Sequence, residues 1–318
     1  MVVWDAPIRD YEFLFNEVFD SIETVQRLGY DDFDADYLSM LMEGWAEHAK
    51  EVWLPINALG DHRGLKFEDG RITMPQEFRD AYRKGIDEGW LSTSCRPEHG
   101  GMGLPIFFQA VTWAEFGTST CMALSVLPAL TIGVYEVLAA NGRQDLIDYF
   151  ATNLASGEWA GTMCLTEPHA GTDLGIITTK ATPQDDGTYR VSGTKIFITY
   201  GEHDMAENIV HLVLAKAPDA PEGSRGISLF LVPKHLPKEW ESGGMGGISH
   251  DLSGELNGIT CSGSEGKMGL HASPTCVMNF DSAKGWIIGE PNQGLACMFT
   301  MMNYERLSIG LQGLGLGE

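Results

Sequence analysis

Apolar residues near the start of the chain recur mostly at intervals of three or four positions. Such spacing places side chains on one face of a helix. Six residues share that face: Tyr11, Leu14, Phe15, Val18, Ile22 and Val25. We therefore expect one amphipathic helix that ends at Gly29.

Two more helices are predicted downstream. Asp34 or Asp36 is suited to cap the second, which we expect to end before Pro55. The third begins near Pro75, and three residues form its apolar stripe: Phe78, Tyr82 and Ile86. A loop rich in glycine and proline follows at 94–105.

The segment CMALSVLPALTIGVYEVLAA, residues 121–140, is the longest apolar stretch of the chain. It is long enough to span a membrane, but Pro128, Gly133 and Glu136 interrupt it. We interpret it as a buried helix of a helical domain rather than as a membrane span.

The pattern changes near residue 158 from helical spacing to short runs of β-branched and aromatic residues. Strands are predicted at 188–199, 208–217, 226–234 and 276–283, and Asp185-Asp186-Gly187 supplies a hairpin turn before the first of these. Short strands separated by turn residues are typical of an antiparallel barrel or sandwich.

Two segments interrupt or follow this β region. Residues 238–266 are rich in glycine without apolar periodicity, which predicts a long surface insertion. Helical spacing returns from Asn292, and the chain stops within that helix, so we expect it to be one piece of a larger protein.

These patterns predict an α+β multidomain fold. Residues 1–157 form an all-α helical domain, residues 158–286 form an antiparallel β-barrel domain, and residues 287–318 begin a C-terminal helical bundle.

Composition and charge narrow the possible functions. The formal net charge of −23, from 21 basic and 44 acidic residues, disfavours binding to nucleic acid or to an anionic membrane. None of the six cysteines forms a Cys-x-x-Cys pair, which favours free thiols, and the histidines show no metal-ligand spacing. No signal peptide is evident at the N-terminus, so we expect a cytoplasmic protein.

Four motifs in fixed order resemble the acyl-CoA dehydrogenase family. They are ASGEWAGTMCLTEPHAGTD (155–173), GTYRVSGTKIFIT (187–199), GKMGLHASPTCVMNFDS (266–282) and GLACMFTMMNYERL (294–307). The long N-terminal arm and the glycine-rich insertion are similar to the large branch of that family, which includes 3-methylmercaptopropionyl-CoA dehydrogenases. The resemblance implies FAD as cofactor and an acyl-CoA thioester as substrate.

The resemblance also assigns flavin contacts to the first motif. Met163, Leu165 and Thr166 would lie along the pyrimidine side of the flavin ring, and Gly171 and Thr172 near the meeting point of substrate and cofactor. The alternative is that the Thr-Glu-Pro sequence only ends a strand and that Gly171 only serves a turn. The family more often has a small residue where this chain has His169, for which we favour solvent exposure or a structural hydrogen bond.

Two residues of the second motif complete the expected cofactor site. Phe197 and Thr199 are two positions apart, which places them on the same face of a strand. The resemblance implies that the Phe197 ring packs on the flavin and that the Thr199 hydroxyl reaches N5. The alternative for Phe197 is an ordinary place in the core.

The implied reaction is α,β-dehydrogenation, in which a carboxylate removes the α proton and hydride leaves from the β carbon. Glu305 occupies the position that a minority of the family uses for this base. The alternatives are an ion pair with Arg306 or a solvated side chain, with the usual base beyond this chain. Arg306 resembles an arginine near CoA, and Asn303 stands where the family often has an aspartate that contacts pantetheine.

The resemblance further implies an electron-transferring flavoprotein as electron acceptor and a homo-oligomer, either a dimer or a tetramer. An acyl-CoA oxidase and a non-catalytic partner subunit that supplies half of a flavin site are the alternatives. DNA-associated relatives are disfavoured by the negative charge. Because the family holds the adenine end of FAD partly with a C-terminal domain, we expect this chain alone to bind FAD weakly.

Overall fold

The computed structural model describes residues 4–236 and 256–317. Its N-terminal segment is a broken helix rather than the single helix that was predicted for residues 11–25. Helix α1 (Ile8–Phe13) continues as a π-helical turn (Leu14–Val18), and α2 (Ser21–Arg27) starts afresh. The break lies at Asp20, whose backbone is left-handed with φ of 45°, a conformation that no helix can continue through.

The next helix begins as predicted but does not end where it was predicted to. Asp34 caps α3 (Ala35–His48) by accepting a hydrogen bond from the Tyr37 N–H at 2.8 Å. The chain then passes through a π-helical stretch (Ala49–Trp53) into α4 (Leu54–Arg63). The predicted end before Pro55 is wrong because proline is tolerated in the first turn of a helix, where its missing N–H has no partner to lose.

A hairpin of β1 (Lys66–Glu68) and β2 (Arg71–Thr73) precedes α5 (Gln76–Asp87), which starts beside Pro75 as predicted. Helix α6 (Ile106–Phe108) and a π-helical stretch (Gln109–Trp113) lead into the long helix α7 (Ala114–Asn141), and α8 (Gln144–Ser156) follows.

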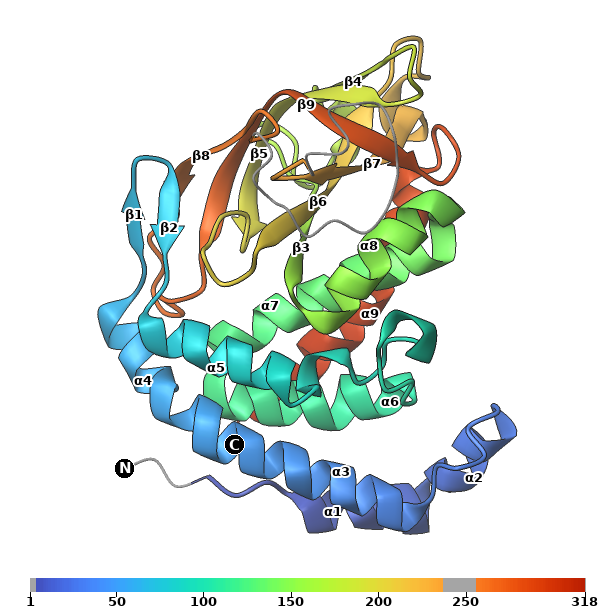
Figure 1. The fold of residues 1–318 in the computed structure, drawn as a ribbon, viewed down its shortest axis with the longest axis vertical. Coiled ribbons are helices and arrows are strands. Elements are labelled where there is room, and N and C mark those ends of the chain that lie inside the picture. Colours follow the sequence, from blue (N-terminus) through green and yellow to red (C-terminus); the bar gives the residue numbers. More distant parts are fainter. Residues whose placement is uncertain (1–3, 237–255, 318) are drawn as a thin grey trace.

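Helix α7 is the core helix that the sequence predicts. Among the described residues it is the one helix long and apolar enough to cross a membrane, and 83% of its most apolar window is buried inside the protein. Figure 1 shows it between the other helices and the sheet.

The described part of the β region contains seven strands: β3 (Trp159–Cys164), β4 (Lys180–Pro183), β5 (Tyr189–Thr199), β6 (Asn208–Lys216), β7 (Ile227–Pro233), β8 (Ile259–Ser264) and β9 (Thr275–Ile288). The predicted hairpin turn joins β4 to β5, which pair antiparallel. The expectation of an antiparallel barrel needs correction, because β3 and β4 both pair parallel with β6 and the sheet is mixed. Two parallel strands need a long connection, and the hairpin of β4 and β5 provides it between β3 and β6.

The sheet is strongly curved. Its order is β3-β6-β4-β5-β9-β7. The last strand of this order, β7, also pairs with the second, β6, so the sheet curves back on itself. Strand β8 pairs with β9. The predicted insertion 238–266 lies outside the described residues as far as residue 255, and its last part is not an irregular loop, because it contains β8.

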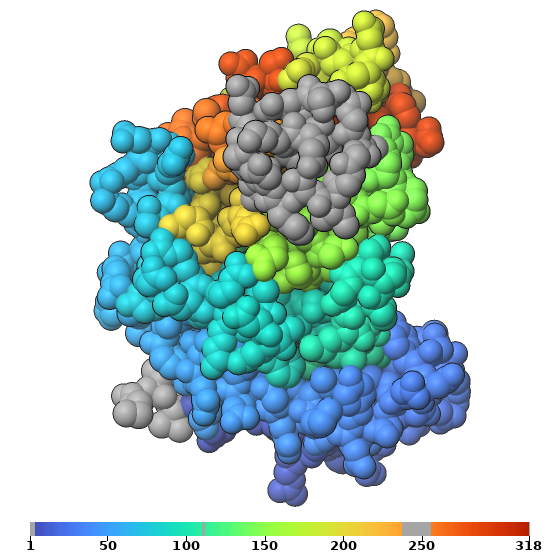
Figure 2. All heavy atoms as spheres, viewed as in Figure 1, coloured from blue at the N-terminus to red at the C-terminus, as the bar shows by residue number. Residues whose placement is uncertain are grey.

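Helix α9 (Gly294–Gly315) connects the sheet to the helical layer. Its first residue packs on the backbone of Ser228 in β7, and its last residue packs on the carbonyl of Glu115 in α7. Figure 1 shows α9 running from the sheet down among the N-terminal helices. Figure 2, in the same view, shows the helical part and the β part in contact with each other.

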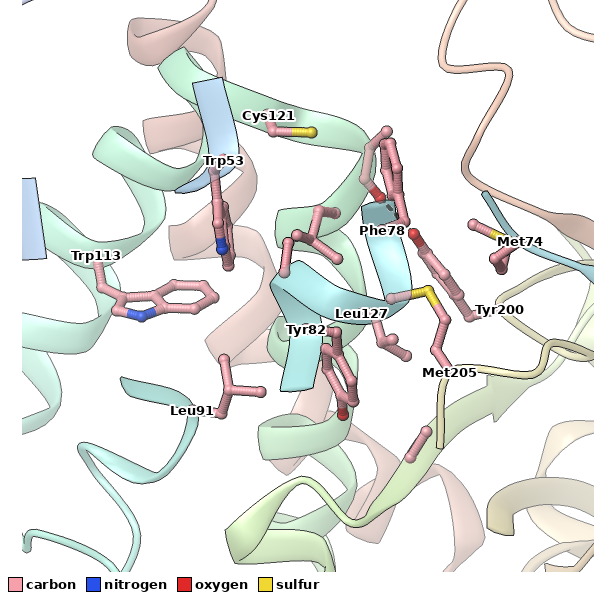
Figure 3. Close-up of a cluster of buried hydrophobic side chains, with 14 of the residues drawn as sticks. Trp53, Met74, Phe78, Tyr82, Leu91, Trp113, Cys121, Leu127, Tyr200 and Met205 are labelled. Carbon is pink, nitrogen blue, oxygen red and sulfur yellow. Dashed lines mark hydrogen bonds between the residues drawn. The ribbon is translucent and has the colours of Figure 1, made fainter. Parts of the chain in front are cut away.

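Two apolar clusters hold these parts together. The first joins the N-terminal helices to the inner face of β5, β8 and β9, and in Figure 3 Phe78 and Tyr82 of α5 meet Leu127 of α7 beside Tyr200 and Met205. The Tyr200 hydroxyl donates to the Ala123 carbonyl at 2.5 Å. The second cluster joins α7, α8 and α9 to β3, β6 and β7. The domain limits at 157 and 286 stay predictions.

Candidate active site at the end of strand β3

Strand β3 lies unusually close to α7. Gly161 is in contact with Thr131 and Val134, and a Cβ at this position would approach the Val134 side chain to 2.6 Å. The Gly161 N–H donates to the Thr131 hydroxyl at 3.1 Å. This glycine is therefore required by the close packing of strand against helix.

The residues that follow β3 form a tight turn. Glu167 and Ala170 exchange backbone hydrogen bonds of 2.9 and 3.0 Å. Gly171 does not need left-handed backbone freedom, since its φ is not positive, and a Cβ there would meet only the Thr166 side chain at 3.7 Å. This contact would be an ordinary one, so both the cofactor role and the turn role of Gly171 stay predictions.

The predicted contact residues on this segment are partly open. Met163, Leu165 and Thr166 are half-buried and Gly171 and Thr172 are exposed. Three of their neighbours are buried: Thr162, Cys164 and Glu167. The structure thus places all five predicted residues along one accessible strip.

A buried ion pair between Lys195 and Glu167 holds the backbone of this strip in place. Lys195 of β5 is fully buried, and its Nζ donates to the Leu165 carbonyl at 2.8 Å and to Glu167 Oε1 at 2.9 Å. The Glu167 carboxylate also accepts from the N–H and hydroxyl groups of Thr178 and Thr179 at 2.6–3.1 Å. Burial opposes the charged carboxylate, but these hydrogen bonds and the ammonium outweigh it and lower the pKa of Glu167 to about 2.

Phe197 is exposed rather than part of the core. Its side chain is 57% exposed, and its backbone is left-handed with φ of 59°, at a bulge between Lys195 and Ile198. The prediction that Phe197 and Thr199 lie on the same face of the strand rested on strict alternation of side chains, which the bulge interrupts. The exposure pattern agrees with it nevertheless, since Phe197 and half-buried Thr199 lie on either side of buried Ile198.

The bulge also connects β5 to the turn, because the Ile196 N–H donates to the Thr166 carbonyl at 2.9 Å. An exposed aromatic residue held at a left-handed φ costs free energy, and such strain concentrates at functional sites. The hydrogen bond from Ile196 places the bulge beside the turn after β3, and the cofactor contacts of Phe197 and Thr199 stay predictions.

Glu305 of α9 is half-buried, and among the described residues it forms no ion pair with Arg306. Its Oε1 is buried without a hydrogen-bond partner among the described residues and lies 3.2 Å from where a Cβ of Gly133 would be. Desolvation raises the pKa of Glu305 to about 7. Arg306 instead donates to Asn303 Oδ1 at 3.0 Å and lies 5.4 Å from the Phe299 ring centre, on an exposed part of the helix.

One turn of α7 links Glu305 to β3. Thr131 and Val134 pack against Gly161 of β3. Gly133, which lies between them in the sequence, packs against Met301 and Glu305 of α9. Glu305 and Gly161 of β3 therefore pack on the same turn of α7.

His169 departs from the family pattern without joining the site. It is exposed, and its Nε2 lies 3.2 Å from the Ile176 carbonyl oxygen and 3.6 Å from Glu167 Oε2. This agrees with the expected structural hydrogen bond.

Sequence reasoning missed the Lys195–Glu167 pair and a polar cluster around Gln109 and Tyr304. The signal for the pair was a lysine directly before the apolar residues 196–198 of strand β5, two positions before Phe197. A charged residue there has to face a partner in the core.

Comparisons with known proteins agree with this geometry. Family models for the N-terminal and middle domains of acyl-CoA dehydrogenase match residues 36–158 and 162–283. A 3-methylmercaptopropionyl-CoA dehydrogenase of Ruegeria pomeroyi is 42% identical over 100% of this chain and 52% of its own length. A butyryl-CoA dehydrogenase of Syntrophomonas wolfei is 36% identical over 96% of this chain and 50% of its own length. The chain thus spans about half the length of the curated relatives it matches.

Solved structures share the fold. A butyryl-CoA dehydrogenase of Megasphaera elsdenii superposes with a TM-score of 0.69 at 22% identity, over 87% of this chain and 65% of that one. An acyl-CoA dehydrogenase of Bacillus anthracis, solved in complex with FAD, gives 0.70 at 22% identity, over 90% of this chain and 43% of that one.

Proposed function

The chain belongs to the acyl-CoA dehydrogenase family, and from this premise we propose that it takes part in the α,β-dehydrogenation of an acyl-CoA thioester with FAD as hydride acceptor. The observation that carries the proposal is Glu305, a half-buried glutamate whose Oε1 is buried without a hydrogen-bond partner among the described residues and whose pKa is raised to about 7. It packs on the same turn of α7 as Gly161 of β3. Strongly perturbed carboxyl groups of this kind are typical of proton-transfer sites.

The residues present fit a flavin. Gly171 leaves surface that a Cβ would cover, and Phe197 offers an exposed ring at a strained backbone position. We propose that Met163, Leu165, Thr166, Gly171 and Thr172 hold one edge of the cofactor. Phe197 and Thr199 would support its face and its reactive nitrogen. When bound, FAD supplies the acceptor for the hydride from the β carbon.

The chain's own groups would handle the proton. Glu305 in its ionised form takes the α proton, and its raised pKa makes it a stronger base than an ordinary glutamate at neutral pH. The apolar contacts around it, which include Gly133 and Met301, exclude water from the proton transfer. Lys195 and Glu167 hold the strip after β3 in place, and Arg306 and Asn303 are proposed to contact the CoA part of the substrate.

Several finer points rest on the family alone. We propose an electron-transferring flavoprotein as the electron acceptor, a homo-oligomeric assembly and a cytoplasmic location. An oxidase would differ by reducing oxygen to hydrogen peroxide. A short acyl group is favoured, since both relatives described above are named for small acyl thioesters.

The test is product formation by the FAD-loaded protein in its full-length form. Incubation with butyryl-CoA and an artificial electron acceptor is expected to yield the 2-enoyl thioester, identified by a mass loss of two hydrogens. Absence of any enoyl product from short, medium and long acyl-CoA thioesters would refute the proposal. Peroxide in stoichiometric amount with oxygen alone would favour the oxidase.

A further inference from the structure

Two of the six cysteines meet across neighbouring strands. Cys261 of β8 and Cys276 of β9 are free thiols, and they are 3% and 0% exposed. Cys261 pairs with Met278 and Cys276 pairs with Ser264, so the two cysteines are diagonal neighbours on the inner face of this strand pair. Their side chains are in hydrogen-bond contact. The two sulfur atoms therefore already face each other.

A bulge in β8 favours this contact. In a regular antiparallel pair, diagonal neighbours lie about 7–8 Å apart, at the outer limit for a disulfide bond. Between Cys261 and Gly263, β8 contains one residue more than the facing part of β9. Such bulges bend a strand and increase its twist. Formation of a disulfide therefore requires only a small further approach of the two strands.

Two features distinguish Cys261 from an inert buried thiol. The hydrogen bond between the two thiols lowers the pKa of Cys261, whereas that contact and burial raise the pKa of Cys276. In addition, β8 pairs with β9 alone among the described strands, and Thr260 and Ser262 on either side of Cys261 are exposed. Segments with exposed backbone open locally. Hydrogen peroxide, a small oxidant, can reach the Cys261 sulfur when this edge opens.

Strand β9 connects the two thiols to the proposed cofactor site. Cys276 pairs with Ile198, the residue that directly follows Phe197 at the bulge of β5. The Cys276 sulfur also lies 4.0 Å from the carbonyl oxygen of Glu202, in the segment after β5. A displacement of Cys276 towards Cys261 is therefore transmitted to the backbone that holds Phe197.

We propose that Cys261 and Cys276 form a redox-sensitive modification site, in which hydrogen peroxide converts the two thiols into a disulfide that weakens FAD binding. The Cys261 thiolate attacks one peroxide oxygen and displaces hydroxide, which leaves a sulfenic acid on Cys261. The Cys276 sulfur then attacks the Cys261 sulfur and displaces the second hydroxide. The two hydroxide ions take up the two thiol protons, so the sulfurs lose two electrons in total and the peroxide becomes two molecules of water. Only the effect on FAD rests on the proposed function.

The first test is the covalent state of the full-length protein after treatment with hydrogen peroxide. Peptide mass spectrometry, with the remaining free thiols blocked, is expected to find Cys261 linked to Cys276 with the loss of two hydrogens, and dithiothreitol should reverse the link. Cys261→Ser should abolish it, and Cys276→Ser serves the same purpose if the first variant does not fold. Cys297→Ser is the matched control, because Cys297 is buried to a similar degree, at 5% exposure, and the link should form in this variant.

The second test is the affinity for FAD, measured by fluorescence titration of the reduced and the oxidised full-length protein. Oxidation is expected to weaken FAD binding by about fivefold or more, the lower end of ordinary coupling between two sites. The loss should appear in the wild type and in Cys297→Ser, should be absent from Cys261→Ser, and should be reversed by dithiothreitol.

Oxidation of Cys261 without a link to Cys276 would overturn the inference, as would the absence of any oxidation at the two positions. An equal loss of FAD affinity in Cys261→Ser would also overturn it, because other oxidised side chains would then be the cause. A linked pair with unchanged FAD affinity would refute the coupling to the cofactor site. Mass spectrometry requires neither FAD nor turnover, so a linked pair in a protein that forms no enoyl product would support the redox site and refute the proposed reaction.

Discussion

At the scale of single residues, Glu305 shows how position decides chemistry. The sequence presents it beside Arg306, where an ion pair within the helix is the ordinary expectation. The structure turns the two side chains to opposite environments: Arg306 lies outside with Asn303 and Phe299, and the Glu305 carboxyl lies inside against Gly133. Adjacent residues of a helix project about 100° apart, so one can be buried while the other is exposed.

The raised pKa of Glu305 has a consequence for stability. A carboxyl group whose folded pKa lies above its unfolded value of about 4.5 binds its proton more tightly in the folded state, so its destabilising effect appears as pH rises from 4.5 through 7. The substitution Glu305→Gln removes this penalty and is expected to increase the free energy of unfolding by roughly 1–3 kcal/mol at pH 8 and to change it little at pH 4.5. Urea unfolding at the two pH values measures the difference.

Glu98→Gln at an exposed position is the matched control for replacing a glutamate by glutamine. An equal effect of Glu305→Gln at both pH values would show that the carboxyl is not titrating between them. It would also remove the main reason for regarding Glu305 as a tuned base.

At the scale of elements, the bulge in β5 is the least predictable feature of the site. Alternation along the strand predicted a shared face for Phe197 and Thr199, but the left-handed backbone at Phe197 has no signature in composition. It arises because β5 must pair with β9 and also donate a hydrogen bond to the turn after β3.

Phe197→Gly is therefore expected to separate stability from cofactor binding. Glycine adopts the left-handed region without strain, so the free energy of unfolding should change by less than about 1 kcal/mol. FAD affinity of the full-length protein should fall by at least about tenfold, the equivalent of an aromatic contact. Urea unfolding and fluorescence titration of FAD measure the two quantities.

A core phenylalanine would behave differently, with a loss of about 3–5 kcal/mol on truncation. Phe230→Ala in β7, a fully buried position, is the matched control for that behaviour. A large stability loss in Phe197→Gly with unchanged FAD affinity would refute the assignment of Phe197 to the cofactor site.

The Lys195–Glu167 pair joins β5 to the turn and should act as one unit. Lys195→Met leaves a buried carboxylate without its ammonium and is expected to cost about 3–5 kcal/mol of unfolding free energy at pH 7. Because the folded pKa of Glu167 lies near 2, the contribution of its hydrogen bonds is present above its unfolded pKa of about 4.5 and is lost as pH falls towards 2. Chemical unfolding at pH 7 and pH 3 should therefore give a smaller difference between wild type and variant at the lower pH.

Lys216→Met provides the comparison. Its ammonium donates to the Gly175 carbonyl at 2.6 Å near the same loop without a buried carboxylate partner, so a cost of about 1 kcal/mol is expected. Equal costs for the two lysines would mean that Lys195 contributes only one hydrogen bond and does not anchor the turn through Glu167.

At the scale of the whole molecule, the sequence predicted the order of helical region, β region and returning helix, whereas the contact residues after β3 came from the family resemblance and stay predictions. Local patterns carry that information, because strand and helix periodicity depend on near neighbours. The parallel pairing of β3 with β6 and the cluster of Gln109 with Tyr304 depend on contacts between distant segments, which no local pattern reports. The continuation of the chain into α4 at Pro55 was missed for a different reason, since proline both ends helices and starts them.

The central claim is that Glu305 is the group that accepts the α proton. The most direct measurement is the rate of anaerobic flavin bleaching by butyryl-CoA in a stopped-flow instrument, compared between the FAD-loaded full-length wild type and Glu305→Gln. We predict that the substitution lowers the rate by at least about 10²-fold while FAD stays bound, because a general base typically contributes 10²–10⁴-fold. Bleaching of Glu305→Gln at the wild-type rate would contradict the claim and place the base elsewhere.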